Sequence, residues 1–104
     1  MQKNKKYTPL ESVFTETLKA LSDKYEEKNI LDGYQYLVSF DNGYGISIVK
    51  HEGSYGHKDD LWEIAVLKDG KLCYDTPVAD DVVGWLSSAE VMNYVMKVEI
   101  LSAT

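Results

Sequence analysis

The sequence contains no arginine. All 11 basic residues of this 104-residue chain are lysines, against 17 acidic residues, and the formal net charge is −6 at pH 7. Lys3, Lys5 and Lys6 fall in the first six residues, so the balance from residue 7 onward is 8 − 17 = −9. An acidic chain repels phosphate backbones, and arginine is the side chain that grips guanine or phosphate with two hydrogen bonds. Direct nucleic-acid binding is therefore not expected, and the acidity indicates either a device for solubility or a surface that meets a basic partner.

Cysteine and long apolar stretches are also scarce. Cys73 is the single cysteine and cannot form an internal disulfide, which suits a reducing, intracellular compartment. No apolar run approaches the roughly 18 residues of a membrane span. The basic start is not followed by an apolar stretch, so no signal peptide is expected. We predict a single domain over residues 1–104, with residues 1–7 as a flexible basic tail.

The patterning predicts an α+β fold that begins with a helix. Thr8 has the character of an N-cap, Pro9 suits the first helical position, and Glu11 completes a capping box. Apolar residues then recur every three or four positions, so a helix is expected to run to residue 28 or 29.

An antiparallel four-stranded meander is predicted next, because the apolar period changes to two. Asn-Gly at 42–43 and Asp-Gly at 69–70 are typical of tight hairpin turns. The predicted strands are 34–40, 46–50, 61–67 and 72–75. Two C-terminal helices should follow, a short one over 80–86 and a final one that opens with a capping box of Ser87 and Glu90. All helices should pack on one sheet face and leave the other at least partly open.

The connection between the second and third predicted strands holds both histidines, His51 and His57. With the neighbouring carboxylates they could form a metal or acid–base site. The two histidines lack metal-binding helical spacing, and no second cysteine accompanies them. We therefore expect no metal site and no cofactor, and we retain a His/carboxylate-dependent enzyme only as an alternative.

The same connection is longer than a hairpin requires. Gly53 and Gly56 flank Ser54 and Tyr55, so Tyr55 could form an exposed recognition tip or fold back onto the sheet. Both interpretations remain open at the level of sequence.

Four aspartates are candidates for an acidic rim at strand ends: Asp59, Asp60, Asp80 and Asp81. The alternative is that they supply local turn and cap hydrogen bonds. Neutralising Asp59 and Asp60 together is expected to change the free energy of unfolding by no more than about 0.5 kcal/mol, as at ordinary surface sites.

Four motifs follow one another between residues 44 and 91: "YGISIV", "SYG", "LWEIAVL" and "YDTPVADDVVGWL". In this order they resemble a group of small uncharacterised proteins encoded by tailed bacteriophages. The matching residues are Ser54, Tyr55 and Gly56 in the loop, and Tyr74, Asp75, Thr76, Pro77, Asp80, Asp81, Val82, Gly84 and Leu86 in the last segment. His57 stands where the group commonly has glycine, which counts against His57 as a ligand. The resemblance implies phage origin and carries no activity with it.

Together these observations predict a non-enzymatic phage accessory protein in the cytoplasm of the infected bacterial host. It would bind and inhibit a host protein with a basic surface, with carboxylates standing in for nucleic-acid phosphates. A nuclease of anti-phage defence, such as a CRISPR effector, is the expected kind of target. The predicted contact residues are Tyr55, His57, Asp59, Asp60, Asp80 and Asp81. An alternative is a self-associating structural or regulatory module that dimerises through the open sheet face.

Overall fold

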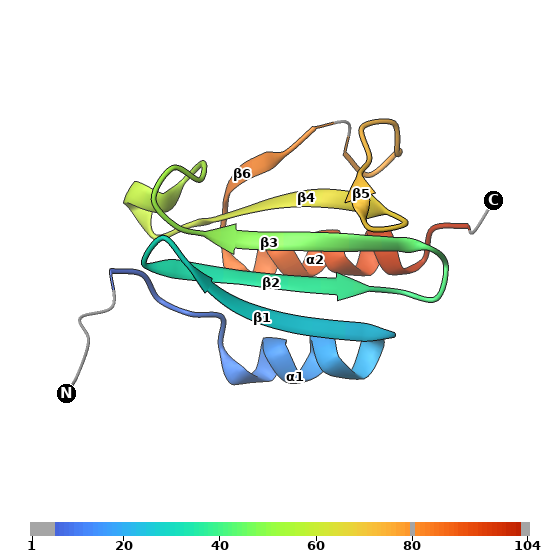
Figure 1. Ribbon diagram of the computed structural model, residues 1–104, viewed down its shortest axis with the longest axis horizontal. Coiled ribbons are helices and arrows are strands. Elements are labelled where there is room, and N and C mark those ends of the chain that lie inside the picture. The colour runs from blue at the N-terminus through green and yellow to red at the C-terminus, as the bar shows by residue number, and fades with distance from the viewer. Residues whose placement is uncertain (1–5, 80, 103–104) are drawn as a thin grey trace.

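The computed structural model describes residues 6–79 and 81–102 as one α+β unit (Figure 1). Along the chain the elements are α1 (Ser12–Leu21), β1 (Lys24–Ile30), β2 (Gly33–Ser39), β3 (Tyr44–Lys50), the 3₁₀ turn η1 (His57–Asp59), β4 (Trp62–Lys68), β5 (Lys71–Leu72), β6 (Val83–Leu86) and α2 (Ser88–Glu99). No helix in the described ranges is both long enough and apolar enough to cross a membrane.

The strands form a single antiparallel sheet in the order β1-β2-β3-β4-β5, and β6 also pairs with β4. β5 and β6 lie along the same side of β4 at its two ends, with Leu72 opposite Leu67 and Leu86 opposite Trp62 (Figure 1). They therefore act as one interrupted fifth strand, and the described residues 74–79, 81 and 82 lie outside the sheet between its halves.

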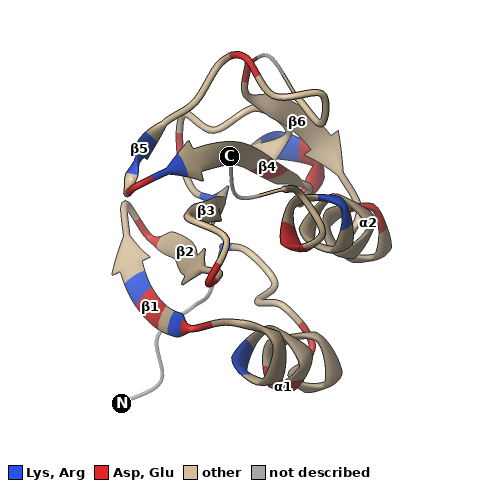
Figure 2. Cartoon of the chain, turned by 90° about the vertical axis from the view of Figure 1, so that its right-hand side faces the viewer, with Lys and Arg blue, Asp and Glu red and all other residues tan. Residues whose placement is uncertain are grey.

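Both helices lie on the same side of the curved sheet, as Figure 2 shows in a view along the strands. Alternate strand residues point toward them and form the core, which includes Tyr36, Ile48 and Ile64 from three neighbouring strands. α2 contributes Val91, Val95 and Val98, all fully buried. The expected arrangement, in which helices cover one face, is present with two helices rather than three.

The capping box predicted for the last helix is confirmed. The Ser87 side chain accepts a hydrogen bond from the Glu90 backbone, and the Glu90 carboxylate accepts one from the Ser87 backbone N–H at 2.8 Å. Two otherwise unpaired donors at the start of α2 are satisfied in this way.

The predicted N-terminal helix is present as α1, but it is shorter than predicted and both of its predicted ends are wrong. Thr8 does not cap it, because the Thr8 backbone N–H and hydroxyl both bond to Asp60, and α1 begins four residues later without a side-chain cap. The second half of the predicted helix is β1, which pairs with β2 through a two-residue turn at Leu31 and Asp32. Both turn residues have positive φ, the backbone geometry that tight hairpins require.

The C-terminal half of the sheet also differs from the prediction. The helix predicted over 80–86 is absent from its described part, residues 81–86, because residues 83–86 are β6 and pair with β4. The predicted strand 72–75 is reduced to β5 and one further backbone bond, from Cys73 N–H to the Val66 carbonyl. The sheet thus has six strands where four were predicted. Tyr7, expected in a flexible tail, is 5% exposed and belongs to the core.

Candidate functional site

The long connection between β3 and β4, residues 51–61, folds against β6. The Tyr55 backbone N–H donates to the Glu63 carboxylate at 2.8 Å, and the Trp85 N–H donates to the Tyr55 carbonyl at 3.3 Å. Glycines allow this close approach: a Cβ on Gly84 would lie 2.3 Å from the Tyr55 Cβ, and one on Gly56 would lie 2.9 Å from the Trp85 Cα. Two segments about 30 residues apart are thereby fixed to each other.

Tyr55 and Trp85, which we call the aromatic platform, stack on each other at the surface. Their ring centroids lie 5.5 Å apart with an interplanar angle of 9°. Tyr55 is 53% exposed and Trp85 is 58% exposed. A hollow of about 310 Å³ beside them is lined by the platform and by residues 53–59. Of the two interpretations of Tyr55, the structure has the exposed one.

Trp85 also has an unusual backbone, with φ of 55°. Side chains other than glycine seldom adopt this left-handed conformation, and when bulky residues do, the strain is commonly associated with function. The Trp85 indole is exposed, whereas the side chain of Leu86, the next residue, is buried. The surrounding hydrogen bonds and the stacked tyrosine hold the strained backbone in place.

An ion pair between the buried Lys50 and the partly exposed Asp60 lies at the base of the loop. The Lys50 side chain is 3% exposed, and its Nζ lies 3.0 Å from Asp60 Oδ1, 2.8 Å from the Thr8 carbonyl and 4.2 Å from the centroid of the Trp62 ring. Residues 7–10, the N-terminal strap, bring Thr8 to this point. The Thr8 N–H and hydroxyl donate to the two oxygens of Asp60 at 2.9 and 2.6 Å.

The pKa values of this pair follow from its geometry. Burial lowers the pKa of Lys50 below its ordinary value, although Asp60 opposes the effect. Burial acts to raise the pKa of Asp60, but the hydrogen bonds from Thr8 and the charge of Lys50 outweigh it, and the pKa is lowered. Asp60 is therefore ionised at neutral pH, and its carboxylate is engaged by Thr8 and Lys50 while the side chain stays 45% exposed.

The two histidines make separate contacts. His57 Nδ1 lies 3.0 Å from the Tyr7 hydroxyl, and the rings meet edge to face. His51 Nδ1 faces the Glu52 carbonyl at 2.8 Å. No group of three or more His, Cys, Asp or Glu side chains suited to a metal ion occurs within residues 6–79 and 81–102.

The predicted acidic rim is only partly assembled. Asp59 and Asp81 are exposed, and Asp81 uses one oxygen to accept the Val82 N–H at 2.7 Å. Asp80 lies outside the described residues. Acidic residues also occur on both helices and on β1, so they spread over the molecule rather than gather beside the platform (Figure 2).

Sequence reasoning identified Tyr55 and missed Trp85, because the segment 80–86 was expected to be helical. A signal was present: "VVGWL" places two β-branched residues and an aromatic around a glycine, a composition that favours a strand with a close backbone approach. The chain matches no protein-family model, and comparisons with curated proteins and with solved structures give no significant match.

Proposed function

We propose that this protein is a non-enzymatic binding protein and that the aromatic platform anchors it to a partner protein. The observation that carries the proposal is the exposed, stacked Tyr55–Trp85 pair, whose backbones are joined by a hydrogen bond. Tyrosine and tryptophan are the side chains most enriched at the energetic centres of interfaces. Leaving two large aromatic rings in water is otherwise unfavourable for a folded domain.

The platform is organised before any partner arrives. Gly56 and Gly84 let the two backbones touch, and the Glu63 carboxylate fixes the Tyr55 N–H. Because little side-chain freedom remains to be lost, binding would incur a smaller entropic cost than binding through a mobile loop. The hollow beside the rings can receive one side chain of the partner.

The resemblance to phage-encoded proteins supports a host protein as the partner, and the net charge of −6 supports one with a basic surface. Asp59 and Asp81 are exposed acids that lie four residues from Tyr55 and from Trp85, respectively. In this proposal they guide the encounter and the platform supplies most of the affinity. Inhibition of a defence nuclease by phosphate mimicry is the most specific form of the proposal.

The test begins with affinity capture from a lysate of a bacterial host, followed by binding measurements with the purified partner. Tyr55→Ala and Trp85→Ala should each weaken binding by about 30-fold or more, which corresponds to about 2 kcal/mol. Tyr74→Ala is the matched control, because Tyr74 is 54% exposed and lies outside the platform. It should change the dissociation constant less than twofold.

Salt dependence then tests the acidic component. If Asp59 and Asp81 mimic phosphates, replacing both with asparagine should flatten the dependence of affinity on salt. An unchanged salt dependence would eliminate mimicry while leaving the platform in place. Equal effects of Tyr74→Ala and Trp85→Ala would refute the platform itself, and a concentration-dependent dimer without a captured partner would favour self-association.

A further inference from the structure

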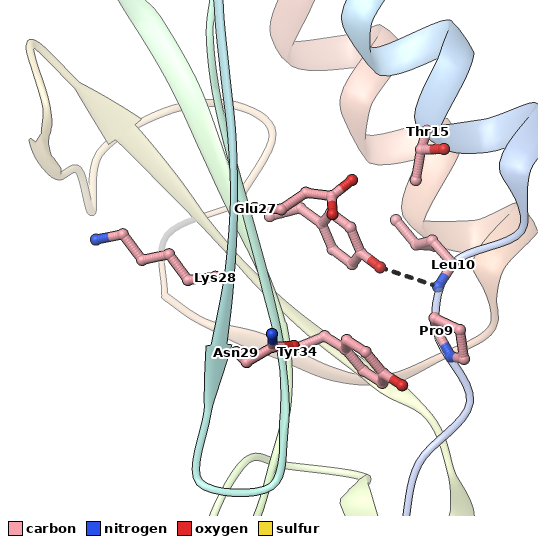
Figure 3. Close-up of a pocket in the computed structure, with 8 residues that line it drawn as sticks. Pro9, Leu10, Thr15, Glu27, Lys28, Asn29 and Tyr34 are labelled. Atoms are coloured by element: carbon pink, nitrogen blue, oxygen red, sulfur yellow. Dashed lines mark hydrogen bonds between the residues drawn. The ribbon is translucent and has the colours of Figure 1, made fainter. Parts of the chain in front are cut away.

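A second hollow lies between the N-terminal strap and the β1–β2 hairpin. It encloses about 300 Å³ and is lined by Pro9, Leu10, Thr15, Glu27, Lys28, Asn29, Tyr34 and Tyr36. Figure 3 shows the sheet residues on one side and the strap with the start of α1 on the other. Its size is at the small end of ligand pockets, so it suits a single functional group on a short chain rather than a large molecule.

One charged group points into this hollow. The Glu27 carboxylate lies between the sheet and α1, whereas the Lys28 ammonium extends away on the other side of the sheet (Figure 3). One Glu27 oxygen accepts the Tyr25 hydroxyl at 2.5 Å. Among the described residues none donates a hydrogen bond to the second oxygen. The charged group that faces the hollow is thus the carboxylate of Glu27, an exposed residue, and it has one acceptor atom available.

The charge of Glu27 affects the pKa of the neighbouring tyrosines. Burial is the largest cause that raises the pKa of Tyr36 and of Tyr25, and the charge of Glu27 raises both further. A negative field that disfavours tyrosinate favours a cation in the same place.

Aromatic rings form the floor of the hollow. Tyr34 and Tyr36 stack with centroids 6.5 Å apart and an interplanar angle of 17°. The Tyr36 hydroxyl is held by the Leu10 N–H at 3.3 Å, so the ring is fixed from the strap. Aromatic faces next to a carboxylate are the surroundings that attract organic cations.

We propose that this hollow, the Glu27 pocket, binds an alkylammonium or guanidinium group. The carboxylate would accept a charge-assisted hydrogen bond from the cation, while the tyrosine rings and Pro9 would contact its alkyl chain. The charge of Glu27 disfavours anions, and a neutral alkyl chain would offer no donor to its second oxygen. The cation could belong to a free diamine or to a lysine or arginine side chain of a protein.

The Glu27 pocket is separate from the aromatic platform, so the inference does not rest on the proposed function. The two lie at the same end of the molecule, since the strap that forms one wall of the pocket also binds the 51–61 loop through Thr8 and Asp60 (Figure 1). A basic partner bound to the platform would have this pocket within reach.

Titration of the ¹⁵N-labelled full chain with two probes tests the inference. Cadaverine represents a free diamine, and N-acetyl-lysine-methylamide represents a side chain. At least one should shift the amide signals of Glu27, Tyr34 and Tyr36, whereas pentane-1,5-diol, the neutral analogue of cadaverine, should not. Shifts with cadaverine alone identify free diamines as the ligand class, and shifts with the lysine derivative identify side chains.

Glu27→Gln and Glu26→Gln form a matched pair, because they make the same chemical change at consecutive strand residues that point to opposite sheet faces. Glu27→Gln should weaken probe binding about tenfold, a loss of about 1.4 kcal/mol. Glu26→Gln should change it less than twofold. Far-UV circular dichroism checks that both variants fold, and Glu27→Asp, which withdraws the carboxylate, should also weaken binding. Absence of shifts with both cations, or equal effects of the two Gln variants, would overturn the inference.

Discussion

Replacing Asp60 with asparagine should destabilise the protein far more than its position in a surface loop suggests. Asparagine keeps the size of the side chain and tolerates the positive φ of 59° at this residue, so the change removes charge with little effect on the backbone. What remains is the Lys50 ammonium, 3% exposed, with the Thr8 carbonyl and the Trp62 ring as its surroundings. A buried charge without its counter-ion is the main source of the expected loss.

The magnitude follows from the burial of the two partners. Removing one member of a fully buried ion pair costs about 3–5 kcal/mol. The Asp60 side chain is 45% exposed, so solvent already screens part of the attraction and the cost must be reduced. We expect Asp60→Asn to lower the free energy of unfolding by about 2 kcal/mol. This replaces the loss of no more than about 0.5 kcal/mol that the sequence indicated, because Asp60 is not an ordinary surface residue.

Lys50→Met is the informative partner variant. It removes the buried charge and leaves Asp60 exposed enough for water to solvate it, with both hydrogen bonds from Thr8 retained. The expected loss is about 1 kcal/mol or less, and Asp60→Asn should cost less in the Lys50→Met background than in the wild type. Urea denaturation followed by circular dichroism measures all four members of the cycle. The reasoning fails if Lys50→Met is the more damaging change, or if the two effects are additive.

Three further outcomes are expected. Gly84→Ala should cost about 1–3 kcal/mol in urea denaturation and change tryptophan fluorescence, because its Cβ would lie 2.3 Å from that of Tyr55 and must separate the platform. Unchanged emission would contradict this contact. Leu31→Asn should raise the stability by about 0.5–1 kcal/mol, since Leu31 is exposed and holds φ of 48° in the β1–β2 turn. Because the pKa of Asp60 is lowered in the folded state, its contribution is present above its unfolded value of about 3.9 and is lost as pH falls through the folded value. The acid-induced loss of stability should be shallower in Asp60→Asn.

The elements that the sequence predicted correctly are those determined by neighbouring residues. The β2–β3 hairpin needs only alternation and the Asn42–Gly43 turn, and α2 needs only its capping box and apolar stripe. The prediction for the β1 segment was wrong because its structure depends on a neighbouring strand rather than on local sequence. Its apolar residues also fit a helical stripe, and pairing with β2 decided the outcome.

In the candidate site, too, features that depend on neighbouring residues were easier to predict than contacts between distant segments. The flanking glycines left two positions open for Tyr55, one of them exposed, whereas its stacking partner Trp85 lies 30 residues further along and meets it only through the sheet. The role of Asp60 was equally hidden, because its partners Thr8 and Lys50 come from two segments far from each other in the sequence. The sequence shows that residue 60 is an acid, but only the tertiary structure shows that Lys50 and Thr8 bind its carboxylate.

The attachment of the N-terminal strap has a consequence for the order of folding. Tyr7 meets His57 and Thr8 meets Asp60 across sequence separations of 50 and 52 residues, whereas the hairpins of the meander join near neighbours. Bringing together residues far apart in sequence costs more chain entropy than forming a hairpin. We therefore expect the meander to form first and the strap to dock late. The last segment to dock is commonly among the first to open under native conditions. The amide of Thr8 should therefore exchange its hydrogen sooner than the amides of β3, and the loop that carries Tyr55 should loosen with each such opening.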